Sequence, residues 1–251
     1  MKKRLNVVFC LSLILVLLLS IVSAGRWEDF WSKITGKSIS TGEIDYWVSK
    51  INEIGKRGVA REFLISQEYN ENFIRGQYKK FLGTEPTNKD LFDLRYKERE
   101  EIIHFLASTP EYYGQKSNSN NRDYITNLYV DILGHEREDF SKYPHEYESA
   151  IDYWENALSS YSKQQIVQFF IDSKEYREDR VNEFYKKFLE RDPQPNEINY
   201  WSDYLVEHSE KDFIIEILDS WEYWGRQGNS NRNFVIALYK DVLDRGENII
   251  L

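Results

Sequence analysis

Apolar residues recur at helical spacing along most of the chain from Thr41 onward. The clearest stripe lies between residues 181 and 189, where apolar side chains occupy positions i, i+3, i+4, i+7 and i+8. This spacing places the side chains on one face of a helix with 3.6 residues per turn. No run of comparable length alternates apolar and polar residues, as a half-buried strand would. The pattern therefore predicts an all-α fold.

Three motifs of the stretch from Ile151 to Leu189 also occur 107 residues earlier in the chain. They are a Tyr-Trp pair, a Ser-x-Glu-Tyr sequence and a Tyr-Lys-Lys-Phe-Leu sequence. One fixed offset for three motifs predicts an internal duplication of helical units. The matching segments are Tyr46-Trp47 with Tyr153-Trp154, residues 66–69 with 173–176, and residues 78–82 with 185–189.

A second set of segments extends the duplication. The apolar positions of residues 124–133 match those of 234–243, and each segment follows an Asn-Ser-Asn loop. We therefore expect a first helical repeat domain at 42–147 and a second at 148–251, each with two related units of about fifty residues. The unit at 91–96 has lost its tryptophan. The last unit is incomplete, and the sequence leaves open whether it meets the first in space.

The first 24 residues have the three-part form of a secretory signal. A basic start at Lys2 to Arg4 precedes an apolar run from Val7 to Val22, and small residues follow up to a predicted cleavage site after Ala24. The alternative is an uncleaved membrane anchor, because the apolar run is long for a signal and slightly short for a span. Both place the rest of the chain outside the cell.

Residues 25–41 form a short amphipathic linker in which Trp27, Phe30 and Trp31 recur at helical spacing. We interpret it as a hydrophobic cap on the first repeat, and the alternative is a helix that lies at the membrane interface. Cys10 lies within the leader, so the mature chain would contain no disulfide and its stability must come from packing.

The net negative charge of the chain argues against nucleic acid as a partner. Without the three basic residues of the leader the chain carries 30 basic and 42 acidic side chains, a net charge of −12. A surface with that balance repels the phosphate backbone, so we expect no nucleic-acid partner. With 41% hydrophobic and 16% aromatic residues, the chain has enough apolar side chains for a sizeable core.

The serines of the Ser-x-Glu-Tyr motifs are predicted to begin helices. A serine hydroxyl accepts a hydrogen bond from a backbone N–H of the first turn, and the following glutamate favours the positive end of the helix dipole. This assigns Ser66, Ser173 and Ser220 as N-caps. Ser108 with Glu111 has the spacing of a reciprocal capping box.

The paired aromatics are predicted to fill the spaces between helices, because a large aromatic at a fixed repeat position usually lies in the core. The alternative is a platform on which sugars stack. Trp221 and Trp224 differ, since the first repeat has no tryptophan at the matching places, and we assign them as a possible surface-binding patch. The predicted core aromatics are Tyr46, Trp47, Tyr153, Trp154, Tyr200 and Trp201.

Signatures of catalysis and of metal binding are weak in the sequence. His104, His135, His145 and His208 show no metal-ligand spacing, and no nucleophile elbow, phosphate loop or dinucleotide motif occurs. The charged run 97–101 is interpreted as a solvated face. The asparagine-rich loops could hold calcium, but they lack the order of an EF-hand, and helix capping is the simpler explanation. No catalytic residue and no cofactor is predicted.

The order of these motifs resembles the domain of unknown function 4214 (DUF4214) family. The resemblance rests on Tyr153-Trp154, the run 170–176, Tyr185 with Leu189, the turn 191–193 and Tyr200-Trp201. It implies an all-helical module similar to the linker domain of phycobilisomes, found in secreted and cell-surface proteins and without an established activity. This chain departs from the family in lacking a glycine before Tyr200-Trp201, and in having Gly134-His135-Glu136 where the family has an Arg-x-Pro turn.

These observations predict an exported, non-catalytic structural or interaction module of the cell surface. Its expected partner is an extracellular protein or a cell-envelope component, with the membrane contacted only through the N-terminal segment. The competing hypothesis is an extracellular protein that binds or hydrolyses glycans, since a pair of carboxylates in a sugar cleft would suffice for hydrolysis.

Overall fold

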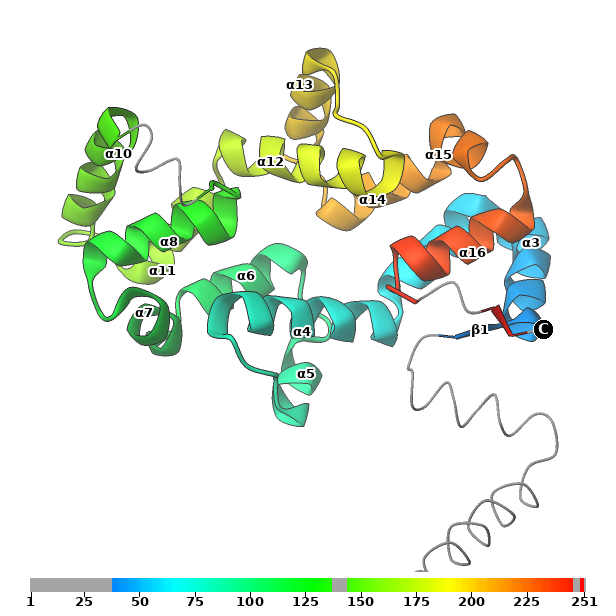
Figure 1. The fold of residues 1–251 in the computed structure, drawn as a ribbon, viewed down its shortest axis with the longest axis horizontal. Helices are drawn as coiled ribbons and strands as arrows, with labels where there is room; N and C mark the ends of the chain where they lie inside the picture. The colour runs from blue at the N-terminus through cyan, green and yellow to red at the C-terminus, as the bar shows by residue number, and fades with distance from the viewer. Residues whose placement is uncertain (1–37, 137–143, 246–248, 251) are drawn as a thin grey trace, which may run out of the picture.

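The computed structural model describes residues 38–136, 144–245 and 249–250, and nearly all of them lie in helices or in the turns between helices (Figure 1). This confirms the all-α prediction. The predicted leader at 1–24, and the linker as far as residue 37, lie outside the described residues. In the part of the chain that the structure describes, no helix combines the length and the apolar character needed to cross a membrane.

The helices follow one another through short connections. In the first half they are α3 (Thr41–Ile65), α4 (Gln67–Leu82), α5 (Asn88–Leu94), α6 (Arg99–Ala107), α7 (Pro110–Ser117) and α8 (Asn121–Leu133). In the second half they are α10 (Pro144–Ala157), α11 (Lys163–Ile171), α12 (Lys174–Phe184), the π-helix η1 (Tyr185–Leu189), α13 (Pro195–Tyr204), α14 (Glu210–Asp219), α15 (Trp221–Arg226) and α16 (Asn231–Asp241).

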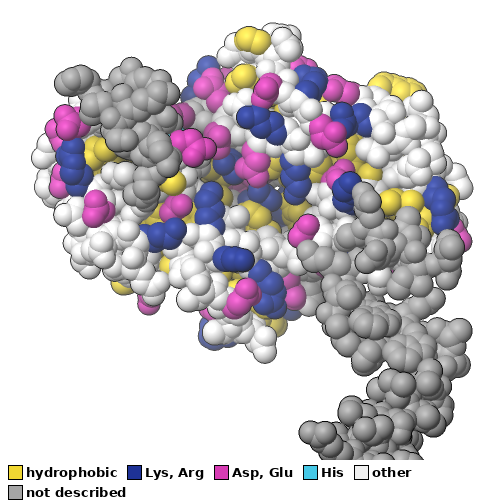
Figure 2. All heavy atoms as spheres, viewed as in Figure 1, with side chains coloured by type: hydrophobic (Ala, Val, Ile, Leu, Met, Phe, Trp, Pro, Cys, Tyr) yellow, Lys and Arg dark blue, Asp and Glu magenta, His cyan; other side chains and the backbone are white. Residues whose placement is uncertain are grey.

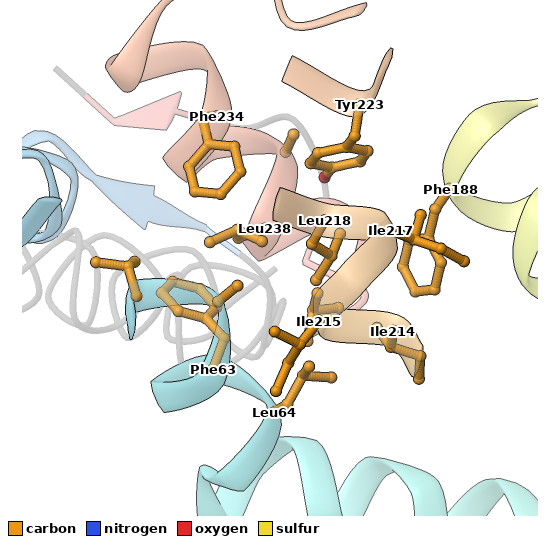
Figure 3. Close-up of a cluster of buried hydrophobic side chains, with 14 of the residues drawn as sticks. Phe63, Leu64, Phe188, Ile214, Ile215, Ile217, Leu218, Tyr223, Phe234 and Leu238 are labelled. Atoms are coloured by element: carbon orange, nitrogen blue, oxygen red, sulfur yellow. The ribbon is translucent and has the colours of Figure 1, made fainter. Parts of the chain in front are cut away.

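The helices bury two separate hydrophobic cores. One core takes its side chains from residues between Ile74 and Tyr176, and the other combines residues 39–69 with residues 181–243. Figure 3 shows the second core, in which side chains of α3, α14 and α16 point toward one another. The cores therefore do not follow the predicted division at residues 147 and 148. The boundary between them crosses α4 and α12, because each of these helices packs one end into each core.

The two ends of the described chain lie together (Figure 1). Helix α16 packs against α3, as the equivalent α8 packs against α10 and α11. The strand β1 (Ile39–Ser40) pairs in parallel with β2 (Ile249–Ile250), with Ile39 opposite Ile249. Helix α16 and strand β2 thus bring the later part of the described chain against its beginning.

Contacts of one kind, between a glutamate and a basic side chain, recur between the helices. The glutamate of a Ser-x-Glu-Tyr motif pairs with the basic residue that follows a left-handed residue at a helix end. Two guanidinium groups bind their carboxylates bidentately, which fixes geometry as well as charge. The pairs are Glu175 with His135 (2.6 Å), Glu222 with Arg191 (2.6 and 2.8 Å) and Glu68 with Arg245 (2.8 and 2.5 Å). The last pair joins the two ends of the chain.

Most of the predicted helix caps are confirmed. Ser66, Ser173 and Ser220 each accept a hydrogen bond from the backbone N–H three residues later. The prediction for Ser108 was wrong, because the cap of α7 is Thr109, which has extended backbone angles. The proline that follows Thr109 occupies the first helical position and forces the residue before it out of the helical region. Ser108 instead ends α6.

Helix α3 bends at Gly55, whose φ of 73° and ψ of 170° are outside the helical region. Such angles are accessible to glycine almost alone. Because of this bend, the single helix α3 corresponds to two helices in the second half of the chain, α10 and α11, which are joined by a turn. Its first part carries Trp47 and its second part carries Phe63, and the rings of these two residues lie 5.0 Å apart.

Candidate functional site

The Tyr-Trp pairs divide between core and surface. Trp47, Trp154 and Trp201 are half-buried and pack against the cores, as predicted. Their tyrosine neighbours are exposed, by 65% for Tyr153, so the assignment of Tyr46, Tyr153 and Tyr200 to the core was wrong. Adjacent residues on a helix point about 100° apart, and one of the two must face solvent.

Each of these tryptophans contacts a tyrosine of another helix. The indole N–H of Trp201 donates to the hydroxyl of Tyr185 at 2.7 Å. Trp154 is hydrogen-bonded to Tyr129 and Trp47 to Tyr239 in the same way. The buried indole N–H thereby obtains the partner that a half-buried tryptophan needs.

The predicted surface patch lies on α15. Trp221 is 83% exposed, whereas Trp224 is half-buried against Phe234. The ammonium group of Lys56, on the second part of α3, lies 5.5 Å from the Trp221 ring and 3.9 Å from the Trp224 ring. We call these three residues the α15 patch. It presents a large apolar ring and a cation–π pair to solvent.

A buried ion pair lies where the two halves of the chain meet. Arg99 and Glu210 begin the equivalent helices α6 and α14, and their side chains are joined by a 2.6 Å hydrogen bond. Arg99 also donates to the Tyr69 hydroxyl at 3.1 Å, and the Tyr176 hydroxyl donates to Glu210 at 2.6 Å. The two tyrosines are themselves equivalent residues of the Ser-x-Glu-Tyr motifs. The four side chains form one satisfied network, with Arg99 9% and Glu210 1% exposed.

Further charges surround this network. Figure 2 shows Lys, Arg, Asp and Glu side chains gathered around the middle of the face, between α4 and α12. Burial lowers the pKa of Lys80 and of Lys187, which occupy equivalent positions in the Tyr-Lys-Lys-Phe-Leu motifs. Arg180, which is 8% exposed, pairs with Asp179 and Glu183. The centre of the molecule is therefore polar, and the apolar cores lie to either side.

A cavity of about 330 Å³ opens beside the network. Its walls come from α6, α11, α12, α14 and the end of α13, and an adjoining cavity of about 350 Å³ shares Glu100, Gln168 and Ile171 with it. Burial, and after it the negative charge of Glu210, raises the pKa of Glu100 to about 7. A cavity with a perturbed acid is a candidate for a functional site. The residues that line the first cavity are Glu100, Gln168, Ile171, Asp172, Tyr176, Arg177, Arg180, Leu205, Val206 and Glu210.

This cavity is not predicted from the sequence, because the run 97–101 is interpreted there as a solvated face. Arg99 is buried and Glu100 is partly buried, so that interpretation was wrong for both residues. A signal was present in the pattern. Arg99 occupies the first position of the apolar stripe Ile102, Ile103, Leu106 and Ala107, and Glu210 occupies the same position before Phe213, Ile214, Ile217 and Leu218. A charged residue on an apolar stripe indicates a buried pair.

The histidines lie apart from one another. His104 contacts the carbonyl of Gln164, His135 lies between Tyr147 and Glu175, and His208 stacks on Tyr204. The side chain of His145 lies outside the described part. In the asparagine-rich loops, Asn120 caps α8 and Ser230 caps α16. Among the described residues no group of His, Cys, Asp or Glu could hold a metal ion.

No family model matches the chain, and neither a curated protein nor a solved structure matches it.

Proposed function

We propose that this chain is an exported, non-catalytic interaction module that binds an extracellular protein or a cell-envelope component. Two recurring contacts support an origin of the module by tandem duplication. The Tyr112 hydroxyl donates to Asp131, and the equivalent Tyr223 hydroxyl donates to Asp241, each at 2.9 Å. The indole-to-tyrosine bonds recur in the same manner. A helical frame closed by such contacts holds its surface side chains in fixed positions.

The α15 patch carries the proposal. Trp221 follows the N-cap Ser220, so its backbone is held by the start of α15 while its ring faces solvent. Exposure of a tryptophan ring costs free energy that burial in a complex would recover, and tryptophan is enriched among residues that dominate binding. Lys56 adds a positive charge that would meet an acidic or aromatic group of the partner.

The arrangement in the cavity supports a non-catalytic function over glycan hydrolysis. Hydrolysis of a glycosidic bond needs one carboxyl as acid and a second as base or nucleophile. Glu100 could supply the acid, but both oxygens of Glu210 already accept hydrogen bonds, one from Arg99 and one from Tyr176. The other carboxylate of the lining, Asp172, accepts from Gln168. The ion pair with Arg99 holds Glu210 in a structural position.

The test is cosedimentation of the purified chain with cell envelopes of the source organism. We expect saturable binding that Trp221→Ala weakens by about tenfold or more, as for a residue that dominates an interface. Tyr200→Ala is the matched control, because it removes an exposed aromatic ring of another helix. Equal binding by the two variants would refute the assignment of the patch.

The same experiment separates the two classes of partner. Envelopes treated with protease lose a protein partner, whereas envelopes treated with glycan-degrading enzymes lose a carbohydrate partner. Loss of pelleting after the second treatment alone would favour the sugar-binding alternative, in which Trp221 is the stacking ring.

A further inference from the structure

Four aromatic rings form a continuous surface on α10, α11 and the turn between them. The Trp154 ring meets Tyr153 edge-on at 5.1 Å and stacks on Phe169 at 5.9 Å. Phe169 in turn meets Tyr161 at nearly a right angle, with the ring centres 5.3 Å apart. Tyr153 is 65%, Tyr161 43% and Phe169 41% exposed. We call these four residues the α10–α11 surface, and apolar rings that are both exposed and contiguous mark an interaction site.

Phe169 and Tyr161 go beyond what the repeat requires. Glutamate replaces Phe169 in both of the units that carry another Tyr-Trp pair. Helix α6 has Phe105 at the equivalent position, but its unit lacks the tryptophan that stacks on Phe169. The residues equivalent to Phe169 and Tyr161 are Glu62 and Ile54 in the unit of Trp47, and Glu216 and His208 in the unit of Trp201. Among these units the row of rings is therefore peculiar to α10 and α11, which indicates a role of its own.

The border of this surface is almost uncharged. Residues 156–171 contain a single charged side chain, whereas the chain average of 30% would give about five. Asn156 and Gln165 are exposed amides that lie one helical turn from Tyr153 and Phe169, respectively. The rings are thus bordered by neutral groups that both donate and accept hydrogen bonds.

Acidic side chains flank the surface on both helices. Asp152 and Glu155 on α10 pair with Arg122. Asp172, which follows the end of α11, accepts a hydrogen bond from Gln168. In a chain that is acidic as a whole, these carboxylates disfavour an acidic ligand.

The size of the surface limits what can cover it. Its exposed rings amount to about 300 Å², taking about 200 Å² for a whole aromatic side chain. A stable protein interface buries about 800 Å² on each side, more than half of it apolar, so the rings are too few for a second copy of the chain. A membrane surface would favour basic residues beside the rings, but Lys163, the one cation of the stretch, lies 3.9 Å from the Tyr113 ring. These limits favour a small, uncharged ligand with both apolar and hydroxyl-bearing faces.

We propose that the α10–α11 surface binds an uncharged polysaccharide through adjacent sugar rings. The apolar C–H faces of the sugars lie on Phe169 and Tyr161, and the amides of Gln165 and Asn156 form hydrogen bonds with their hydroxyl groups. Figure 1 shows α10 and α15 on opposite sides of the molecule. The site is therefore separate from the α15 patch and adds a second binding activity to the proposed one.

Affinity electrophoresis of the purified chain tests the site in native gels that contain a soluble polysaccharide. The neutral probes are hydroxyethyl cellulose, galactomannan and amylopectin, and the acidic probe is polygalacturonate. We expect at least one neutral probe to retard the protein relative to a non-binding reference protein, and we expect polygalacturonate to leave its mobility unchanged.

Variants assign the binding to the aromatic rings. Phe169→Glu introduces the residue that two equivalent positions already carry, and the affinity should fall by about tenfold or more. Phe105→Glu is the matched control, because Phe105 occupies the equivalent exposed position on α6 and is not part of the surface. Tyr153→Ala is a second test that removes only an exposed ring, and it should also weaken the retardation.

Several outcomes would overturn the proposal. Failure of all three neutral probes to retard the wild type would remove the site, and retardation by polygalacturonate of the same strength would contradict an uncharged ligand. Equal retardation of Phe169→Glu and Phe105→Glu would exclude the α10–α11 surface. Loss of retardation in Trp221→Ala would assign the glycan to the α15 patch instead. Because the purified polysaccharides replace cell envelopes in this assay, a failure here leaves the cosedimentation test of the proposed function unaffected.

Discussion

Neighbouring aromatic residues in this chain have opposite roles. In the pair Tyr153-Trp154, the indole packs against the core and is hydrogen-bonded to Tyr129, while the phenol ring meets it edge-on at 5.1 Å and remains exposed. The motif therefore combines one structural residue with one surface residue. A core assignment from sequence requires the helical phase of a residue as well as its type.

Trp154→Ala should lower the free energy of unfolding by about 3 kcal/mol, the low end for a core aromatic because the ring is only half-buried. Trp154→Phe, which removes only the hydrogen bond and part of the ring, should cost about 1 kcal/mol. Tyr153→Ala should change stability by less than about 0.5 kcal/mol, as for other exposed positions. Urea unfolding of the three variants measures these differences. A larger loss for Tyr153→Ala than for Trp154→Ala would contradict the division of roles.

Glu100 makes stability depend on pH near neutrality. Its folded pKa of about 7 is above the ordinary value of 4.5, so between these values the folded state binds more protons than the unfolded state. Stability is then fullest below about pH 4.5 and falls as pH rises through 7. Glu100→Gln has no such loss, so relative to wild type it should gain on the order of 1 kcal/mol between pH 5 and 8. Thermal unfolding at the two pH values, with Glu207→Gln as control, tests this expectation.

At the scale of helices, α6 and α14 meet through a charged pair at the start of their apolar stripes. Two residues of the same charge at these positions would repel each other, and two neutral polar residues would leave buried groups without hydrogen bonds. The combination of Arg99 with Glu210 avoids both problems. The tyrosines of α4 and α12 complete the hydrogen bonds. A buried ion pair of this type adds little net stability, but loss of one member is costly.

Glu210→Leu should destabilise the protein by about 3–5 kcal/mol, because it leaves the Arg99 charge buried without its partner. The double variant Arg99→Met/Glu210→Leu should recover most of that loss, since both charges disappear together. Equilibrium unfolding of the two single variants and the double variant forms a complete cycle. Purely additive effects would show that the two side chains are not coupled.

The bend in α3 gives a second prediction for an element. Gly55→Ala should cost about 1–3 kcal/mol, because the backbone angles at this residue are strained for any side chain. Space is not the reason, since a Cβ atom there would meet nothing within 4 Å. Gly76→Ala, in the regular interior of α4, should instead stabilise by up to about 1 kcal/mol. Urea unfolding measures the change in stability of both variants. Equal changes would contradict the explanation by backbone strain at Gly55.

At the scale of the whole molecule, the chain is closed by contacts between its ends. Arg245 reaches two carboxylates of the first helices, Glu43 and Glu68. Burial raises the pKa of Glu43, but hydrogen bonds from Ser40 and the charge of Arg245 outweigh burial and hold the pKa below its usual value. The same guanidinium lies 4.9 Å from the Tyr239 ring. The closure thus uses the same type of carboxylate contact as Glu222 with Arg191.

Arg245→Ala should lower stability by about 1–2 kcal/mol and should increase hydrogen exchange in α3 and α16, because it opens the joint between them. Arg232→Ala is the matched control: it also links α16 to α3, through an exposed pair with Asp45. Its expected cost is below about 0.5 kcal/mol. Exchange that rises equally in both variants would mean that the Arg245 pairs do not hold the ends together.

Local pattern alone determined the helical class and most helix starts. The 3.6-residue period requires helices wherever one face must be buried, and the serine caps act within a few residues of their own backbone. The tryptophan positions followed from the same reasoning. Each of these features depends on neighbours in the sequence, and for this reason each could be predicted without the fold.

Only the tertiary structure decided how the halves combine. The packing of α16 on α3, the division between the two cores and the surroundings of Arg99 and Glu100 all depend on residues that are far apart in the sequence. The carboxylate of Glu100 would be solvated on an isolated helix, whereas burial in the folded chain raises its pKa to about 7. The cavity exists because equivalent helices of the two halves face each other, and no local pattern encodes that approach.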